Sequence, residues 1–390
     1  MLELAQHFQG LKDPREVYRT THRFMDVLLI ALLGSLCGCM GWDELEIFAE
    51  GKLKFLKSFL PLEGGAPSAD TFRRIISRLD PDAMTDCFVS WVNDLATALN
   101  DEQLALDGKT LRHSFDRTLG KKALHLVRAW GVNNHLVLGQ VACEEKSNEI
   151  TAVPLLLRML VLKGALVTMD AMGCQKETIE IIAEATGDYL VALKGNQGKL
   201  HDEVIEHFET LEKTQFQSIP EVQQNTQHDP KDPHGRVEVR KVVVETDLSF
   251  SKEKIHWMAL KCVVLVQSYR KVKGVESTEN RYYVCSLPKE KATGARIQEA
   301  VRAHWQIENA LHWVLDVQFG EDTNTIHEGH GAENMATIRN MAINMLKAEK
   351  EGKIGKKGTK AKTRMAGYND DFLVKILSHG FKPPAELSNP

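Results

Sequence analysis

The chain has 390 residues, a net charge of −4 and 43% hydrophobic residues, an ordinary globular composition that excludes a fibrous or largely disordered protein. Its seven cysteines include no C-x-x-C pair, which excludes a disulfide framework and a zinc ribbon and indicates a reducing cytoplasm. The apolar run from Val27 to Met40 is about 14 residues long, whereas a membrane span needs roughly 20. We therefore expect a buried helix there.

Residues 1–100 are expected to form an all-helical amino-terminal domain. Three apolar stretches, separated by loops, predict its main helices: 24–39, 43–60 and 84–98. Ser68 and Asp70 are each suited to cap a further helix that carries Arg73 and Arg74. These two arginines either contact DNA phosphates or belong to an exposed helix face.

After residue 100 the pattern changes to short apolar segments and helices. Three strands come first, followed by helix, strand, helix and strand: 103–107, 123–130, 135–141, 148–160, 165–169, 175–186 and 189–193. Ser147 or Asn148 would cap the first of these helices. Three antiparallel strands followed by alternating helices and strands are typical of a ribonuclease-H-like α/β fold. Residues 101–211 would form the first part of this core.

The middle of the chain, residues 212–290, is expected to be a β-rich insertion. Its first part, 212–235, is polar and predicts an exposed loop. Strand-like runs follow it: 236–245, 256–269 and 281–286. The insertion would thus separate two parts of the core.

Two helices, at about 296–317 and 333–348, return the chain to the core, so residues 291–348 would complete it. A basic carboxy-terminal segment, 349–390, follows. Between Lys347 and Arg364 there are eight lysines or arginines against two glutamates, and glycines interrupt any long helix. This part of the chain either follows phosphates or is a solvated linker.

Glu308 is the carboxylate with the strongest physical argument. On a helical period it falls within an apolar stripe. The stripe consists of Ile297, Val301, His304, Leu311 and Leu315. An ionised carboxylate is costly to bury unless it is paired or binds a metal, so its partner is His304, an arginine or a metal ion.

Asp107 and Asp170 each end an apolar strand, in the segments LALDG and LVTMDA. Carboxylates at the carboxyl ends of strands in an α/β sheet face a ligand crevice, although each alone is also consistent with a turn. The expected fold places the two strands side by side. Together with Glu308, the three acids suit Mg²⁺ or Mn²⁺ as catalytic metal ligands. Two such ions can activate the attacking oxygen and stabilise the leaving oxygen in phosphodiester displacement.

Basic and amide side chains accompany the proposed acids. Lys109 and Arg112 lie in DGKTLRHS, and Lys194 and Asn196 lie in KGNQG after a predicted strand. Such donors are suited to DNA phosphates near a reacting bond. The alternative is that they belong to ordinary turns.

Aromatic and histidine side chains surround the third acid. Trp305 and Trp313 either stack on an unpaired base or pack in the core. Two histidine pairs have zinc-like spacing: His327 with His330, and His304 with His312. Neither pair has a further spaced ligand, which argues against a zinc site.

Seven segments occur in a fixed order: LALDGKTLRHS, EKSNEITAVP, VTMDAMGCQ, DYLVALKGNQG, HGRVEVR, RYYVCSL and HWQIENALHWVLDVQFGED. Together they closely resemble the H-repeat-associated branch of bacterial insertion-sequence transposases, within the DDE superfamily. The resemblance covers nearly the whole chain, including the amino-terminal blocks DPREVYRTTHRFMDVLLIALLGSLCG and PSADTFRRIISRLDP.

This resemblance implies a ribonuclease-H-like core with a β-rich insertion, two Mg²⁺ ions and a helical amino-terminal domain that handles DNA. It makes Asp107, Asp170 and Glu308 the three catalytic acids. Related superfamilies place a Tyr, an Arg and a Lys around the third acid. The corresponding positions here are Val301, His304 and Leu315, so these helper roles do not transfer.

The activity implied is that of a DNA transposase, which cuts phosphodiesters at insertion-sequence ends and joins the 3′-hydroxyl ends to target DNA. Its partners would be double-stranded DNA and a second copy of the chain, because two ends are brought together. We expect it in the bacterial cytoplasm, at the nucleoid when DNA is bound. One alternative is an inactive or domesticated relic that only binds DNA. Another is a metal hydrolase of small phosphoesters.

Overall fold

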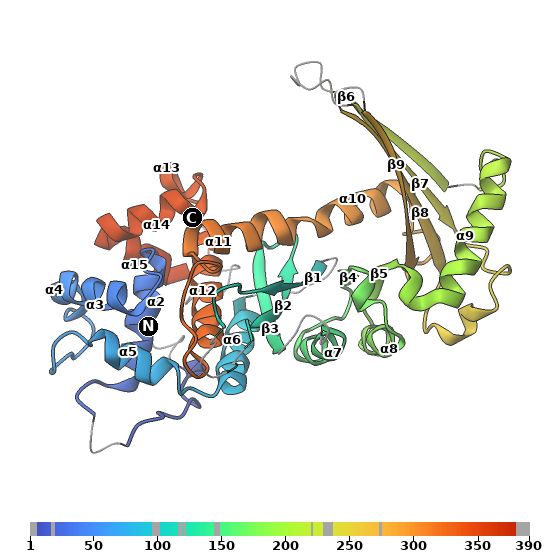
Figure 1. Ribbon diagram of the computed structural model, residues 1–390. Helices are drawn as coiled ribbons and strands as arrows, with labels where there is room; N and C mark the ends of the chain where they lie inside the picture. The colour runs from blue at the N-terminus through green and yellow to red at the C-terminus, as the bar shows by residue number, and fades with distance from the viewer. Residues whose placement is uncertain are drawn as a thin grey trace. The chain divides into compact units, whose positions relative to one another are not determined.

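The computed structural model shows a mixed α/β protein with a nine-stranded mixed sheet (Figure 1). It describes residues 6–16, 20–95, 102–115, 120, 122–143, 149–219, 221–228, 237–272 and 275–379. The chain divides into two units, each described by itself. Unit 1 comprises Met1–Ala98, Gly108–Ala152 and Ile307–Pro390, and unit 2 comprises Leu99–Asp107 and Val153–Gln306.

The amino-terminal part of unit 1 contains helices. Its helices are α2 (Phe24–Leu36), α3 (Trp42–Gly51), α4 (Leu53–Leu56), α5 (Ala69–Ile76) and α6 (Pro81–Leu95). The apolar helix α2 is largely buried, which confirms the expectation for that stretch. The single helix expected at 43–60 is wrong: it is divided at Lys52, next to Gly51, a residue type that weakens helices. Ser68 rather than Asp70 caps α5, because its side chain accepts the backbone N–H of Thr71 at 3.3 Å.

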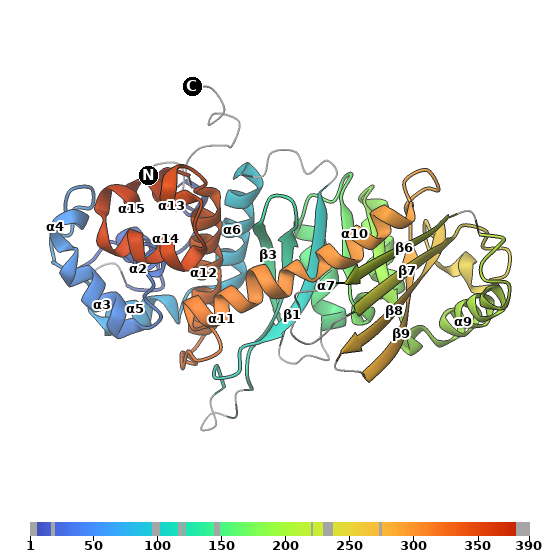
Figure 2. The same cartoon turned by 90° about the horizontal axis from the view of Figure 1, so that it is seen from above.

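A buried helix organises the rest of unit 1. The carboxy-terminal helices are α12 (Gly331–Ala348), α13 (Gly352–Gly355), α14 (Thr359–Tyr368) and α15 (Asp370–His379). Helix α12 packs against α2, α6, α14 and α15 (Figure 2). Its buried polar residues have partners, since the Asn344 amide bonds to the backbone N–H and C=O of Val137 at 2.8 and 2.9 Å. This pairing satisfies groups that would otherwise be costly to bury.

The interpretation of the basic stretch 347–364 as a solvated linker is wrong. The end of α12, all of α13 and the first part of α14 lie within it, and the Lys362 side chain is buried. Its ammonium group donates to the backbone carbonyls of Leu346 and Glu349, at 2.9 and 2.5 Å. Residues 380–390 of the predicted segment lie outside the described part of the chain.

Unit 1 also contains two antiparallel strands, β2 (His125–Gly131) and β3 (Leu136–Cys143), which confirms that part of the expected meander. The strand before them, β1 (Gln103–Thr110), passes through Asp107 and Gly108, where the two units meet along the chain. The strand order of the sheet is β3-β2-β1-β4-β5-β9-β8-β7-β6.

Unit 2 is built on parallel strands. Its β4 (Leu166–Met169) pairs in parallel with β1 on one side and with β5 (Asp188–Leu193) on the other. Its helices are α7 (Glu149–Met159), which enters unit 2 at Val153, α8 (Lys176–Glu184), α9 (Gly198–Lys213) and α10 (Gly294–His304). Helices α8 and α10 lie on opposite sides of β4 and β5 (Figure 1). The predicted caps Ser147 and Asn148 lie outside the described residues.

The insertion extends this sheet with four antiparallel strands. They are β6 (Glu221–His228), β7 (Val237–Glu245), β8 (Cys262–Val272) and β9 (Val275–Cys285), the last paired with β5. The exposed loop expected at 212–235 is therefore wrong for 221–228, where β6 lies, and residues 220 and 229–235 lie outside the described part of the chain. Ile297 and Ala300 of α10 pack on the apolar face of these strands. Within the described part of the chain, no helix is both long and apolar enough to cross a membrane.

Candidate metal centre

The first two predicted acids lie at equal positions on the neighbouring strands β1 and β4. Asp170 directly follows β4, as expected, whereas β1 continues through Asp107 to Thr110, so the expectation that Asp107 ends its strand is wrong. Leu106 of β1 is in register with Met169 of the parallel strand β4, and Asp107 and Asp170 are the next residues. The backbone of Asp170 is still extended, with φ −72° and ψ −179°. Since residues at equal register on parallel strands share a face, the structure brings these two carboxylates to one face of the sheet.

A tight turn fixes the position of Asp170. Its carboxylate accepts the backbone N–H of Met172 at 2.9 Å, at the start of the 3₁₀ turn η3 (Ala171–Gly173). The side-chain amide of Asn196 donates to the carbonyl of Ala171 at 2.7 Å. Asn196, predicted to bind DNA, therefore supports the Asp170 turn through this amide. Both Asn196 and Lys194 are exposed.

The third acid lies in an unexpected helical geometry. The helix predicted at 296–317 consists of α10, a π-helical turn η6 (Ile307–His312) and α11 (Trp313–Phe319). The Glu308 side chain is 52% exposed, whereas Ile307 and Leu311 are fully buried. The expectation of a carboxylate within a buried apolar stripe is thus wrong, because a π turn holds one residue more than an α turn and changes the face on which side chains lie.

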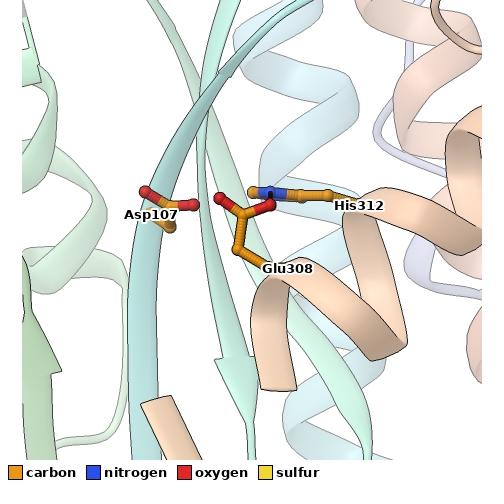
Figure 3. Close-up of side chains that lie close together, drawn as sticks. All are labelled: Asp107, Glu308 and His312. Carbon is orange, nitrogen blue, oxygen red and sulfur yellow. Dashed lines mark ion pairs between the residues drawn. The ribbon is translucent and has the colours of Figure 1, made fainter. Parts of the chain in front are cut away.

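Asp107, Glu308 and His312 form a group with metal-ligand spacing (Figure 3). Each offers one ligand atom, and these atoms all lie within 4.8 Å of one another. Glu308 and His312 belong to unit 1, and Asp107 directly precedes Gly108, the residue at which β1 enters that unit. Asp170 is not one of the three. Oxygen and imidazole nitrogen donors in this number fit a divalent cation.

His312 is a further residue of this site. Its spacing from His304 had suggested only a pair of zinc-like ligands. Its ring is 3% exposed, and Nδ1 lies 3.8 Å from a Glu308 carboxylate oxygen. Burial lowers the pKa of His312, against the opposing influence of Glu308. A neutral imidazole is the form that binds metals. The signal available in the sequence was its spacing, four residues after Glu308, which places both on one helix side.

Lys109 and Arg112, both predicted to bind DNA, differ in their surroundings. The Lys109 ammonium pairs with Asp316 of α11 and lies 3.8 Å from a carboxylate oxygen of Asp322. Its side chain is only 14% exposed. Arg112 is 78% exposed and lies 3.5 Å from Asp322. Arg112 therefore remains accessible to a phosphate, whereas Lys109 links β1 to the segment that follows Glu308.

A second link, between Arg128 of β2 and Glu321, was not anticipated. The guanidinium donates to both carboxylate oxygens, at 3.0 and 2.5 Å, and both side chains are fully buried. Burial raises the pKa of Glu321, but the charge and hydrogen bonds of Arg128 outweigh it and leave the value below normal. Glu321 lies in the GED motif, for which the sequence had predicted no structural role.

The remaining predicted DNA contacts lie on α5. Arg73 pairs with Asp70 and with Glu328, and Arg74 pairs with Asp70 at 2.7 Å. Arg74 is 61% exposed and lines a groove of about 580 Å³ that also contains Arg78. Arg74 and Arg78 are exposed, whereas Arg73 is half-buried between its two carboxylate partners, so α5 presents a charged face.

The two tryptophans beside Glu308 do not pack in the core. Trp305 is 48% exposed and Trp313 is 55% exposed, so the packing alternative is wrong for both. The guanidinium of Arg281 lies 5.7 Å from the centre of the Trp305 ring. Within unit 2, Trp305 also lines a groove of about 350 Å³ that contains Arg270 and Arg302.

Comparison with known proteins adds an independent observation. Residues 99–345 match the family described as "Transposase DDE domain", and residues 5–92 match the family "DDE_Tnp_1-associated". The chain is 36% identical over 385 residues to the "H repeat-associated putative transposase YhhI" of Escherichia coli, covering 96% of this chain and 98% of that protein. It is 39% identical over 281 residues to the "Uncharacterized protein in dhlA 3'region" of Xanthobacter autotrophicus (72% and 92%). It is 33% identical over 76 residues to the "Inactive transposase YbfQ" of Escherichia coli (20% and 90%).

Proposed function

Because this chain belongs to the DDE transposase family, with the H-repeat-associated transposases among its relatives, we propose that it cuts and joins DNA. It would cleave phosphodiesters at the ends of an insertion sequence and join the 3′-hydroxyl ends to target DNA. Its core would have the ribonuclease-H-like fold, to which the order β3-β2-β1-β4-β5 corresponds. The amino-terminal helices would handle DNA.

The observation that supports this proposal is the register of Leu106 with Met169, because Asp107 and Asp170 are the next residues on these two parallel strands. Glu308 lies close to Asp107. An acidic set with oxygen donors fits Mg²⁺ or Mn²⁺. Bound in a pair, such ions supply Lewis-acid stabilisation of the attacking and leaving oxygens in a phosphodiester displacement.

The protein's own contribution would be to hold these ligands in place. The Asp170 turn is fixed by Met172 and Asn196. Asp107 is part of a strand paired on the β4 side. Such preorganisation matters, because a catalytic site loses activity when its ligands are displaced by even a small distance.

DNA contact is proposed at solvent-accessible cations of each unit. In unit 1 these are Arg73, Arg74 and Arg112, and in unit 2 Lys194. Arg270 and Arg302 have no carboxylate partner among the described residues, and they add positive charge beside the exposed ring of Trp305. A cationic groove with an aromatic face suits a nucleic-acid strand. Two DNA ends would be held together by a homodimer.

The test is cleavage of DNA that carries the ends of the element, with purified protein and Mg²⁺. We expect nicked and joined products from the wild type, none after EDTA treatment, and a loss of roughly 1,000-fold or more in Asp170→Asn. Asp202→Asn, which changes an exposed aspartate on α9, is the matched control. Equal product from wild type and Asp170→Asn contradicts the proposal.

A second candidate is a relic that binds DNA without cutting it. This candidate is supported by the similarity of part of the chain to a protein named an inactive transposase. It predicts binding to the element's ends that is unchanged by EDTA, with no product from the wild type under any metal condition. The same cleavage experiment therefore separates the two candidates.

A further inference from the structure

We propose that the π turn Ile307–His312 is a positioning device for Glu308, held in place by Lys109 and Arg128. The inference rests on the proposed function, since it concerns how the third acid reaches its working position. It assigns Lys109, Arg128 and their partners a positioning role. Neither residue needs to touch DNA for this role.

The π turn changes which side chain occupies the apolar face. In an uninterrupted α-helix, Glu308 would lie in line with Ile297, Leu311 and Leu315. The structure instead buries Ile307 completely, and the Glu308 side chain is 52% exposed. One additional residue in the turn corresponds to a rotation of about 100°. The turn therefore directs this carboxylate away from the buried face.

A π turn is rarer and less favourable than the α turn it replaces, and such turns are frequent at functional sites. Strained local geometry persists only where the surrounding structure determines it. The segment after the turn has this support. The residues of α11 and the following loop are fixed to two strands of unit 1 by ion pairs.

The first anchor is the pair of Lys109 with Asp316. Lys109 lies two residues beyond Asp107 on the same strand, and its ammonium contacts the carboxylate of Asp316, eight residues after Glu308. Burial raises the pKa of Asp316, while Lys109 opposes this change. The partly buried pair thus links the strand of the first acid directly to the helix of the third.

The second anchor is the pair of Arg128 with Glu321. Its two hydrogen bonds connect β2 to the loop after α11, in a position closed to solvent. Removing Glu321 would leave the buried charge of Arg128 uncompensated, so this link is strongly maintained. With both anchors in place, α11 cannot rotate to restore the α-helical register at Glu308.

The decisive variant is deletion of Ala310, which removes one residue from the π turn and restores an α-helical count. Its matched control is Ala310→Gly, which removes the same methyl group and keeps the residue number. We expect the deletion to lower DNA cleavage by about 100-fold, as displaced catalytic groups do. The half-saturating Mn²⁺ concentration should rise about 10-fold. The control should retain wild-type cleavage, and circular dichroism and thermal unfolding verify that both variants fold.

If the folded deletion variant cuts DNA and binds Mn²⁺ like the wild type, the inference is overturned. If the deletion variant does not fold, the test uses Asp316→Asn instead, which removes the ion pair between Lys109 and Asp316. Mn²⁺ binding should then weaken about 10-fold, with DNA affinity unchanged, and Asp371→Asn on the exposed part of α15 is its control. Unchanged Mn²⁺ affinity in Asp316→Asn overturns the inference. A wild type that binds Mn²⁺ but never cuts DNA contradicts the proposed function alone.

Discussion

Leu106 of β1 is in register with Met169 of the parallel strand β4, and this pairing determines the candidate site. Each is followed by an aspartate, and the hydrogen-bonded strands keep the two carboxylates at equal positions. The side chains of Leu106 and Met169 are buried. A shift of the strand register by one residue would move them to the opposite face of the sheet, so their burial fixes the register.

The pairing predicts that Asp107 and Asp170 act as a unit. Asp107→Asn and Asp170→Asn should each abolish most cleavage, and the double variant should be no worse than either single one. Residues that hold one shared group give such non-additive losses. Cleavage rates of the four proteins measure this directly. Losses that multiply would show that the two aspartates act independently.

The two strands were predictable from the sequence because both aspartates directly follow short apolar runs, although β1 continues past Asp107 to Thr110. Such runs indicate buried strands, and the chain order placed the two strands together. The cap at Ser68 was predictable for a similar reason, since capping depends on a local hydrogen bond. Features set by neighbouring residues were therefore recovered well.

Other features depended on contacts that the sequence pattern does not contain. The exposure of Glu308 follows from a π turn in a segment whose apolar spacing predicted a continuous α-helix. Strand β6 has a polar sequence, EVQQNTQH, and is a strand through its pairing with β7. Burial of Lys362 required carbonyl partners at the end of α12. Tertiary context overrides local preference at each of these positions.

Lys109 offers a test that distinguishes positioning from DNA contact. Lys109→Gln removes the ion pair with Asp316, so we expect the half-saturating Mn²⁺ concentration to rise about 10-fold, with little change in DNA affinity measured without metal. Lys109→Arg keeps the charge and should recover part of the loss. A fall in metal-free DNA affinity, with metal binding intact, would instead support a phosphate contact.

Gly108 is expected to tolerate no side chain. A Cβ atom there would meet Glu149 and the Nε2 atom of His125, two buried groups hydrogen-bonded to each other at 2.7 Å. Gly108→Ala should lower the free energy of unfolding by about 1–3 kcal/mol, as overpacking does. Gly51→Ala, where nothing lies within 4 Å of the added atom, is the control in urea unfolding. Equal stability of both variants and the wild type contradicts this prediction.

Lys347, at the end of α12, should make stability depend on pH in the alkaline range. Burial, with a smaller contribution from Lys362, lowers the pKa of Lys347 from 10.5 to about 8, although its ammonium lies 4.8 Å from the centre of the Trp130 ring. Between these two values the unfolded chain retains a proton that the folded chain has lost. Stability then rises with pH, because the unfolded state binds more protons.

The measurement is urea unfolding of the wild type and Lys347→Met at several pH values from 7 to about 10.5. Taking the difference between the two proteins removes the contribution of other titrating groups, including His135, whose pKa is lowered by burial and so lies below this range. The stability of the wild type relative to Lys347→Met should be constant below about pH 8 and increase above it. A relative stability that falls over this interval would mean that Lys347 is charged in the folded protein, with the Trp130 ring stabilising the ammonium.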